Sequence, residues 1–519
     1  MRKRALASFG GILMVTALAS PANAEVKLPN VLSDHMVLQA DRKVPIWGAA
    51  TAGEKVTVKF RDQQKEATAG NDGKWRVELD ALKAGGAADE MTVSGTNKLA
   101  IKNVLVGEVW VGSGQSNMAG AVGSYAKNDP VLAKLAEATY PTIRILKGNG
   151  KWAEADPKSL PGFSAILFAF GVNLQKELNV PVGLMVGAVG GTPSGHWLSE
   201  DALRSDEAVK GQIAESAKTY DPAKQQKAYE VALARWEKDV EAAKAAKKNP
   251  PRKPEAPTPP GAVRGGKEGK AGHLYEAHIR PMMPHAIRGV LWDQGESGTA
   301  VAGVDQYVLM GALIKGWRKE WGQDFAFIYV QKPSGLGCAW DPTEPVTDKA
   351  DKFEPLPAAV PADGAYRELH VRIMEHPNTY MAISSDLGPM THPTNKSGYG
   401  ARSARVALGA VYGRKVEIYG PKYKSHTIDG GKIRISFDHI GQGLAFKHGD
   451  KLQGFAIAGA DGKYVWADAV IDGDAVVVSS KTTAQPKSVT YALAARHTWA
   501  NLFNKDGLPA LPFKIDVAK

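Results

Sequence analysis

The stretch that decides the fold is VLVGEVWVGSGQSNM at residues 104–118, an apolar run that ends in Gly114-Gln115-Ser116-Asn117-Met118. The run 104–111 predicts a buried strand, and the glycines after it predict a tight turn into a helix. Ser116 would then lie at the carboxyl edge of a sheet, with its backbone N–H near the positive end of a helix. A serine there is a candidate nucleophile, although serine is also a favoured helix N-cap.

The composition is that of an ordinary globular protein with two or three domains. The chain has 519 residues, of which 44% are hydrophobic and 23% charged, enough to bury a sizeable core. The net charge is +11 at pH 7, a mild excess that favours a solvated surface over nucleic-acid binding. Residues 1–24 combine a basic start, an apolar stretch and Ala22-Asn23-Ala24, as in a signal peptide cleaved after Ala24. We therefore expect a periplasmic or extracellular protein without a membrane span.

Hydrophobic periodicity divides the rest of the chain into three parts. Residues 25–103 hold short alternating segments separated by turn residues, which predicts a small β-sandwich. Residues 104–409 alternate strands with apolar helices such as 163–178, which predicts an α/β domain with a doubly wound parallel sheet. Residues 410–519 predict a second small β domain. The strands expected in the α/β domain are 104–111, 142–146, 182–188, 288–293, 325–331 and 379–385.

One insert, 205–260, interrupts the α/β domain. It begins with an Ala-, Lys- and Glu-rich segment that predicts a helical hairpin with a narrow apolar seam. The seam residues are Tyr229, Leu233, Trp236 and Val240. A proline-rich run, 249–260, follows and predicts polyproline II conformation. The seam could dock a partner, but we expect it to pack against the rest of the domain.

Polar residues that follow the expected strands could carry out acyl transfer, because ligands bind beyond the carboxyl ends of strands in open α/β sheets. Ser116 needs a base, and His392, after the strand 379–385, is well matched to that role near neutral pH. The base in turn needs a carboxylate to fix its tautomer. Asp386 and Glu296 are the two candidates, and Asp386 is favoured because it stands at the strand end.

An acyl-transfer site also needs two or three hydrogen-bond donors for the oxyanion. The backbone N–H groups of Ser116 and Gly191 and the side-chain amide of Gln294 could supply them. Alternatively, Gly190-Gly191 could only permit a tight turn, and Gln294 could be a buried structural group.

The motifs Gly-Gln-Ser-Asn-Met, Gly-Gly-Thr followed by Trp197, Gln-Gly-Glu-Ser and the terminal His-Pro resemble the blocks of SGNH-hydrolase carbohydrate acetylesterases. The similarity is greatest to the sialate O-acetylesterase type and related bacterial hemicellulose acetylesterases, and it covers nearly the whole mature chain. The resemblance implies an SGNH (flavodoxin-like) sheet with Ser116 as nucleophile and His392 as base. It also implies that Gly191 and Gln294 are oxyanion-hole donors.

The chain departs from the family pattern at the acid. Many SGNH hydrolases carry the acid three residues before the histidine, where this chain has Pro389, and many relatives carry it two residues before, where it has Met390. The acid would therefore come from Asp386 or from Glu296.

The resemblance implies a serine esterase that removes O-acetyl groups from a carbohydrate, either sialic acid or a hemicellulose-type glycan. No cofactor is expected, and the histidines show no metal-ligand spacing. Trp197 and Trp292 could stack on sugar rings or belong to the core, and the carboxylate of sialic acid would need a cation such as Arg367, Arg372 or Arg402. The alternatives are a non-catalytic carbohydrate-binding protein and an SGNH lipase or thioesterase of other acyl specificity. The sequence does not indicate an oligomeric state.

Overall fold

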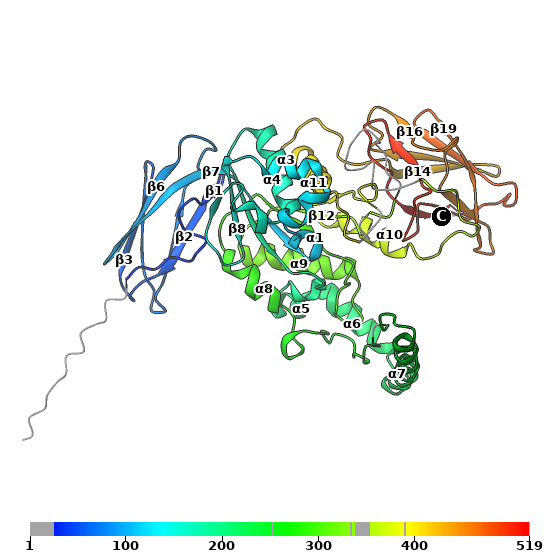
Figure 1. Ribbon diagram of the computed structural model, residues 1–519, viewed down its shortest axis with the longest axis horizontal. Coiled ribbons are helices and arrows are strands. Elements are labelled where there is room, and N and C mark those ends of the chain that lie inside the picture. Colours follow the sequence, from blue (N-terminus) through cyan, green and yellow to red (C-terminus); the bar gives the residue numbers. More distant parts are fainter. Residues whose placement is uncertain (1–24, 252, 333–334, 338–352, 389–390, 518–519) are drawn as a thin grey trace, which may run out of the picture.

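A parallel sheet with helices on both faces lies at the centre of the molecule (Figure 1). The computed structural model describes residues 25–251, 253–332, 335–337, 353–388 and 391–517, so the expected signal peptide and positions 389 and 390 lie outside it. All six strands expected in the α/β domain are present. Their bounds are β7 (Lys98–Gly114), β8 (Tyr140–Lys147), β10 (Val182–Ala188), β11 (Gly289–Asp293), β12 (Ala326–Val330) and β13 (Thr379–Ala382).

The strand order is β13-β12-β11-β7-β10-β8, with β9 (Ala153–Ala155) antiparallel at the edge. The sheet grows outward from β7 in both directions, as in doubly wound folds. However, a flavodoxin-like order would place the second strand beside the first, whereas β10 separates β7 from β8 here, so this part of the prediction is wrong. Nearly all of β10 is buried and suits an interior position, whereas β8 has exposed ends and lies near the edge.

Helices from distant parts of the chain cover the two faces of the sheet. α4 (Ala165–Leu178) and α11 (Lys396–Ala410) share one hydrophobic core with Trp110. α9 (Gln306–Trp321) shares the core of the opposite face with Val111. Because successive residues of a strand point to opposite faces, the neighbours Trp110 and Val111 belong to different hydrophobic cores.

β7 also belongs to the N-terminal β unit. Its first part pairs antiparallel with β6, and its second part pairs with β10 and β11 in the central sheet. The expected boundary between residues 103 and 104 therefore falls inside one continuous strand. The other strands of this unit are β1 (Val37–Gln39), β2 (Val44–Ala49), β3 (Lys55–Phe60), β4 (Gln63–Thr68), β5 (Lys74–Leu79) and β6 (Asp89–Ser94).

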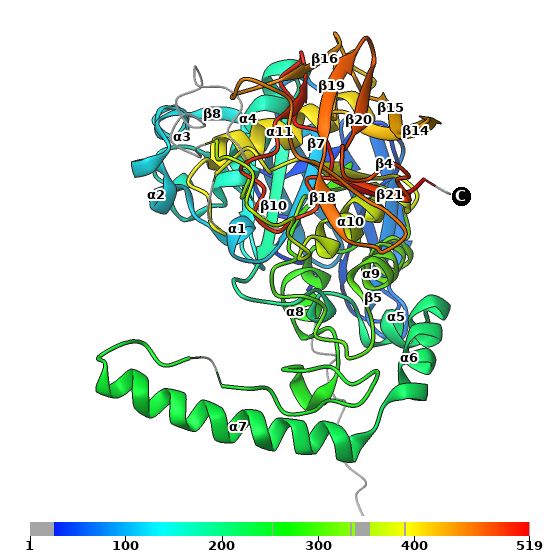
Figure 2. The same cartoon turned by 90° about the vertical axis from the view of Figure 1, so that its right-hand side faces the viewer.

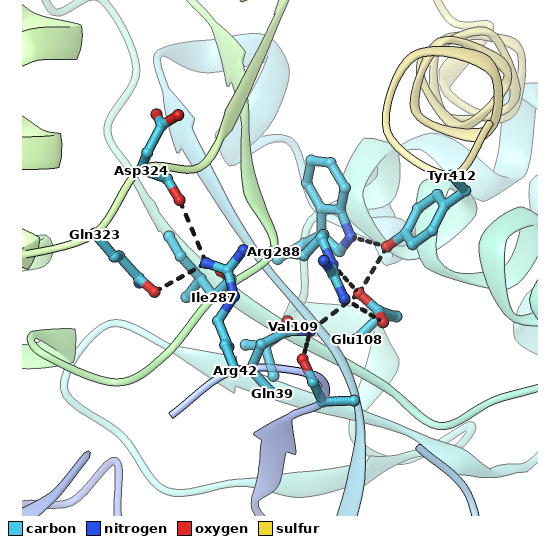
Figure 3. Close-up of polar contacts among 11 residues, drawn as sticks. Gln39, Arg42, Glu108, Val109, Ile287, Arg288, Gln323, Asp324 and Tyr412 are labelled. Carbon is cyan, nitrogen blue, oxygen red and sulfur yellow. Dashed lines mark hydrogen bonds and ion pairs between the residues drawn. The ribbon is translucent and has the colours of Figure 1, made fainter. Parts of the chain in front are cut away.

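A buried carboxylate joins the N-terminal unit to the sheet (Figure 3). Glu108 in β7 accepts hydrogen bonds from Gln39 at 3.1 Å, from Arg288 at 2.6 and 3.0 Å, and from Tyr412 at 3.0 Å. These partners come from β1, from the residue before β11 and from the segment after α11. Since a buried carboxylate is tolerated only where it is well paired, Glu108 holds these segments together at the sheet edge opposite Ser116.

The C-terminal part forms separate antiparallel sheets around its own hydrophobic core, as expected for a second β domain. One four-stranded sheet has the order β14-β15-β20-β19, another has β18-β17-β21-β23, and β16 pairs with β22. The bounds are β14 (Lys422–Asp429), β15 (Lys432–Asp438), β16 (Leu444–Phe446), β17 (Phe455–Ala458), β18 (Tyr464–Trp466), β19 (Asp468–Asp472), β20 (Ala475–Ser479), β21 (Ser488–Tyr491), β22 (Leu502–Asn504) and β23 (Phe513–Asp516).

The insert forms an arm that projects from the body, with α7 at its far end and an extended segment beside it (Figure 2). Its helices are α5 (Glu200–Ser205), α6 (Glu207–Thr219) and α7 (Pro222–Ala245), and α7 buries none of its residues. The Trp236 indole N–H donates to the Pro251 carbonyl at 2.8 Å. The proline-rich segment, rather than the rest of the domain, thus covers this part of the seam.

The remaining α-helices are short: α1 (Ser116–Ala119), α2 (Val122–Tyr125), α3 (Pro130–Ala136), α8 (His273–His278) and α10 (Ala365–Arg372). Within the described residues, no helix combines the length and the apolar character needed to cross a bilayer.

Candidate active site

Ser116 is the first residue of α1, immediately beyond the carboxyl end of β7. The turn before it depends on Gly114, whose φ is +124°, because a Cβ there would lie 2.2 Å from the Asp293 carbonyl oxygen. The Gln115 N–H donates to the same carbonyl at 2.8 Å. The close approach of β11 therefore fixes the backbone that presents the Ser116 hydroxyl.

The structure brings Ser116 and His392 together. The Ser116 Oγ lies 2.6 Å from His392 Nε2, and His392 is exposed to solvent. This distance suits proton transfer from the hydroxyl to a neutral imidazole. A hydroxyl in contact with an imidazole is the arrangement that a serine nucleophile and its general base require.

Asn117 connects the turn that carries Ser116 to the loop that carries His392. Its side-chain N–H donates to the Thr391 carbonyl at 3.0 Å, and its side-chain oxygen accepts from Lys396 Nζ at 2.5 Å. The Lys396 ammonium also lies 4.5 Å from the centre of the Tyr125 ring, and burial lowers its pKa to about 7. Sequence reasoning missed these roles, although Asn117 directly follows the nucleophile.

The two candidate acids have partners other than His392. Arg402 donates to both oxygens of Asp386, at 3.1 and 2.9 Å, and both side chains are buried. Glu296 accepts from Gln115 Nε2 at 2.9 Å and lies 3.1 Å from Lys332 Nζ. No carboxylate hydrogen-bonds to His392 among the residues that the structure describes, which omit positions 389 and 390.

A buried lysine supports the floor of the site. Lys332 Nζ lies 2.5 Å from Asp293 Oδ1, and both side chains are fully buried. Burial alone would lower the pKa of Lys332, but Asp293 and Glu296 raise it above the ordinary value. Lys332 therefore stays charged between β11 and the Glu296 loop and fixes their relative position. No local sequence pattern marks this pairing.

The loop Gly190-Gly191-Thr192 lies against Ser116, since a Cβ on Gly190 would be 3.5 Å from the Ser116 Cβ. Gly191 adopts a φ of +72°, which glycine tolerates without strain. The glycine loop therefore packs closely against the turn that carries Ser116.

The Gln294 amide has backbone partners. Its Nε2 donates to the Thr192 carbonyl at 3.3 Å and to the Gly298 carbonyl at 3.0 Å, and its oxygen accepts from Gln306 at 3.1 Å. Gln294 is fully buried. In this arrangement it ties the glycine loop to the loop after β11.

Trp197 and Trp292 are core residues. They are 0% and 1% exposed, and their rings meet edge to face at 6.1 Å. Of the two alternatives that the sequence left open, stacking on sugar rings or a place in the core, the burial of both rings favours the core. The Trp197 indole N–H instead donates to Thr192 Oγ1 at 3.0 Å and so supports the glycine loop from below.

A small cavity of about 200 Å³ lies beside α1. Its walls include Met118 and Ala119 from α1 and Ala188 from the end of β10, with His278 at one side. Among the described residues, no group of three His, Cys, Asp or Glu side chains is placed to hold a metal ion.

Comparisons with known proteins agree with the motifs. The family model for "Carbohydrate esterase, sialic acid-specific acetylesterase" matches residues 106–246. The sialate O-acetylesterase of Rattus norvegicus is 28% identical over 460 residues, covering 78% of this chain and 77% of the rat protein. That of Homo sapiens is 26% identical over 544 residues, covering 94% and 92%.

A solved structure extends the similarity to three dimensions. The crystal structure of a carbohydrate acetylesterase from Xanthomonas citri superimposes with a TM-score of 0.71 and 28% identity, covering 95% of this chain and all of that one. Together these comparisons confirm the resemblance to carbohydrate acetylesterases of the sialate O-acetylesterase type.

Proposed function

We propose that this chain, a carboxylic ester hydrolase similar to the sialate O-acetylesterases, removes O-acetyl groups from a carbohydrate through an acetyl-serine intermediate. The observation that carries the proposal is the 2.6 Å contact between Ser116 Oγ and His392 Nε2 at the carboxyl edge of the sheet.

The reaction begins when Ser116 Oγ attacks the acetyl carbonyl carbon and His392 Nε2 takes up the hydroxyl proton. The oxyanion lies near the N–H groups of Ser116 and Gly191, each worth about 3 kcal/mol in such a position. The C–O bond to the sugar then breaks, and His392 returns the proton to the sugar oxygen. Water, deprotonated by His392, attacks the acetyl-serine, releasing acetate and restoring the serine hydroxyl.

The residues around this pair hold it in place. Asn117 bonds to the carbonyl of Thr391, the residue before His392, so it fixes the approach of the imidazole to Ser116. We assign Asp386 to anchoring the His392 loop through Arg402, rather than to orienting the imidazole directly. Glu296 acts through Gln115, the residue before the nucleophile.

The three arginines considered for a sialic acid carboxylate are engaged or buried. Arg402 holds Asp386, Arg367 is 1% exposed, and Arg372 lies 4.6 Å from the centre of the Tyr307 ring. We therefore leave the sugar open between sialic acid and a hemicellulose-type glycan. We also propose secretion directed by residues 1–24, which N-terminal sequencing of the mature protein would test.

The test is acetate release from O-acetylated sialic acid and from acetylated xylan and xyloglucan oligosaccharides. Ser116→Ala should abolish release, whereas Ser124→Ala, an exposed serine on α2, should retain it. An initial burst of p-nitrophenol from p-nitrophenyl acetate, equal to one per enzyme, would indicate the acetyl-serine.

Two other outcomes would contradict the proposal. Activity that rises with acyl chain length would favour a lipase or thioesterase. Absence of release from every ester, with carbohydrate binding retained, would favour a non-catalytic binding protein.

A further inference from the structure

Arg367 is a buried arginine to which the described residues supply no counter-ion. It lies on α10, is 1% exposed, and its Nε and Nη1 atoms have no hydrogen-bond partner. No ion pair reaches it from the described part of the chain. Burial lowers its pKa to about 9, and the group that acts in the opposite direction, the Tyr491 phenol, is uncharged near neutral pH. An unpaired buried charge is strongly unfavourable, so this arrangement needs an explanation.

Two buried histidines share the surroundings of this arginine. Among the residues that the structure describes, His370, three residues later on α10, has no hydrogen-bond partner at either ring nitrogen, and His497 from the C-terminal β unit has none at Nδ1. Burial, and then the charge of Lys332, lowers the pKa of His370 to about 3. Burial and then the charge of Arg367 lower the pKa of His497. Both imidazoles are therefore neutral, and each carries one N–H donor.

The surrounding structure holds these groups in place behind the active site. The Tyr329 hydroxyl donates to the His370 carbonyl at 2.5 Å, and the Tyr366 hydroxyl donates to the Gly295 carbonyl. A Cβ on Gly295 would lie 2.8 Å from His370 Nε2, so the histidine packs directly under the loop that carries Glu296.

We propose that Arg367, His370 and His497 form a buried binding site for a small monovalent anion, either a halide or a small carboxylate. One negative charge would neutralise the guanidinium, and the anion would accept hydrogen bonds from the guanidinium and the two imidazoles. Water could fill the same hydrogen bonds but could not balance the charge. A cation is excluded at this place by the guanidinium itself. The site does not depend on the chemistry of Ser116.

Thermal unfolding of the full chain tests the proposal, because a ligand that binds only the folded state raises Tm with its concentration. We expect Tm of the wild type to rise by roughly 2–3 °C when chloride, bromide or acetate reaches about 100 times its Kd at constant ionic strength. Comparison of the titrations with chloride, bromide and acetate identifies which anion binds more tightly.

For the variant Arg367→Met, the sign of the difference in Tm from the wild type should depend on the anion concentration. In a buffer without small anions its Tm should equal or exceed that of the wild type, since a buried unpaired charge has been removed. At high anion concentration its Tm should fall below that of the wild type. The matched control is Arg372→Met on the same helix, half-exposed, which should keep the full anion response.

A second measurement uses the wild type alone and so is valid even if Arg367→Met does not fold. Bromide-soaked crystals of the wild type should show an anomalous peak within hydrogen-bonding distance of the Arg367 guanidinium. A carboxylate of the chain itself against Arg367, or an identical salt response of Tm in all three proteins, would overturn the proposal.

Discussion

Replacing Asn117 by aspartate tests whether the Ser116–His392 geometry depends on the residue between the two loops. The wild-type amide donates to the Thr391 carbonyl and accepts from Lys396. An aspartate keeps the acceptor for Lys396 but removes the donor, and it places a carboxylate oxygen against the Thr391 carbonyl. The Asn117→Asp variant should therefore push the His392 loop away from Ser116.

The magnitude follows from these two contacts. The lost hydrogen bond is worth about 1 kcal/mol, and a carbonyl left facing an acceptor costs about 1–3 kcal/mol. The two effects together make the catalytic position of His392 less favourable by about 2–4 kcal/mol. Since ~1.4 kcal/mol corresponds to a tenfold change in rate, kcat/KM should fall by roughly 30- to 1,000-fold. Tm should change little, because aspartate pairs more strongly with the Lys396 ammonium.

The assay is the steady-state and burst-phase hydrolysis of p-nitrophenyl acetate, with Tm measured on the same samples. Asn173→Asp is the matched control, since the Asn173 amide also donates to a backbone carbonyl, that of Ala169, but within α4. A kcat/KM within twofold of wild type for Asn117→Asp would refute the positioning role. So would equal losses of activity in both variants.

The remaining predictions concern two other buried ion sites. The pKa of Lys396 in the folded protein, about 7, is below its ordinary value of 10.5, so the unfolded chain binds more protons between these values. The free energy of unfolding of the wild type, relative to that of Lys396→Met, should therefore rise from pH 7 to pH 10 by at most ~1.4 kcal/mol per pH unit. Urea unfolding of both proteins across this pH range measures it, and a constant difference between them would contradict the prediction. Asp386→Asn should destabilise the fold by about 3–5 kcal/mol because it leaves Arg402 buried without its partner, with kcat retained within about tenfold. A loss near 10⁴-fold at unchanged Tm would instead make Asp386 the acid that orients His392.

The sequence was most informative where the signal is local. The expected strand 182–188 matches β10 residue for residue, because a buried apolar run bounded by proline and glycine has clear ends. The expected helix 163–178 begins two residues later as α4, since Ser164 is its N-cap and accepts from the Leu167 N–H. The contact between Ser116 and His392 followed from motifs at the ends of strands.

Other features depend on long-range pairing and carry no local signal. Arg402 reaches Asp386, and Lys332 reaches Asp293, only after helices and strands have packed. The departure from a flavodoxin-like strand order has no local signal for the same reason, since which strand lies beside β7 depends on how the crossovers pack. Trp197 was ambiguous because an aromatic residue near a site motif can face either the solvent or the core.

The continuity of β7 also has a consequence for how the chain folds during synthesis. The partners of its first half, β1 and β6, precede it in the chain, whereas β10 and β11 are made only after α1 and several further helices. The N-terminal unit can therefore hold the first half of β7 in an extended, paired state before β10 and β11, the strands that pair with its second half, have been synthesised. In a chain that lacks residues 25–97, the first half of β7 would be unpaired and exposed to other chains. Residues 25–97 thus provide the pairing partners on which β7 forms, and their deletion should increase aggregation more than it lowers the activity of the chains that fold.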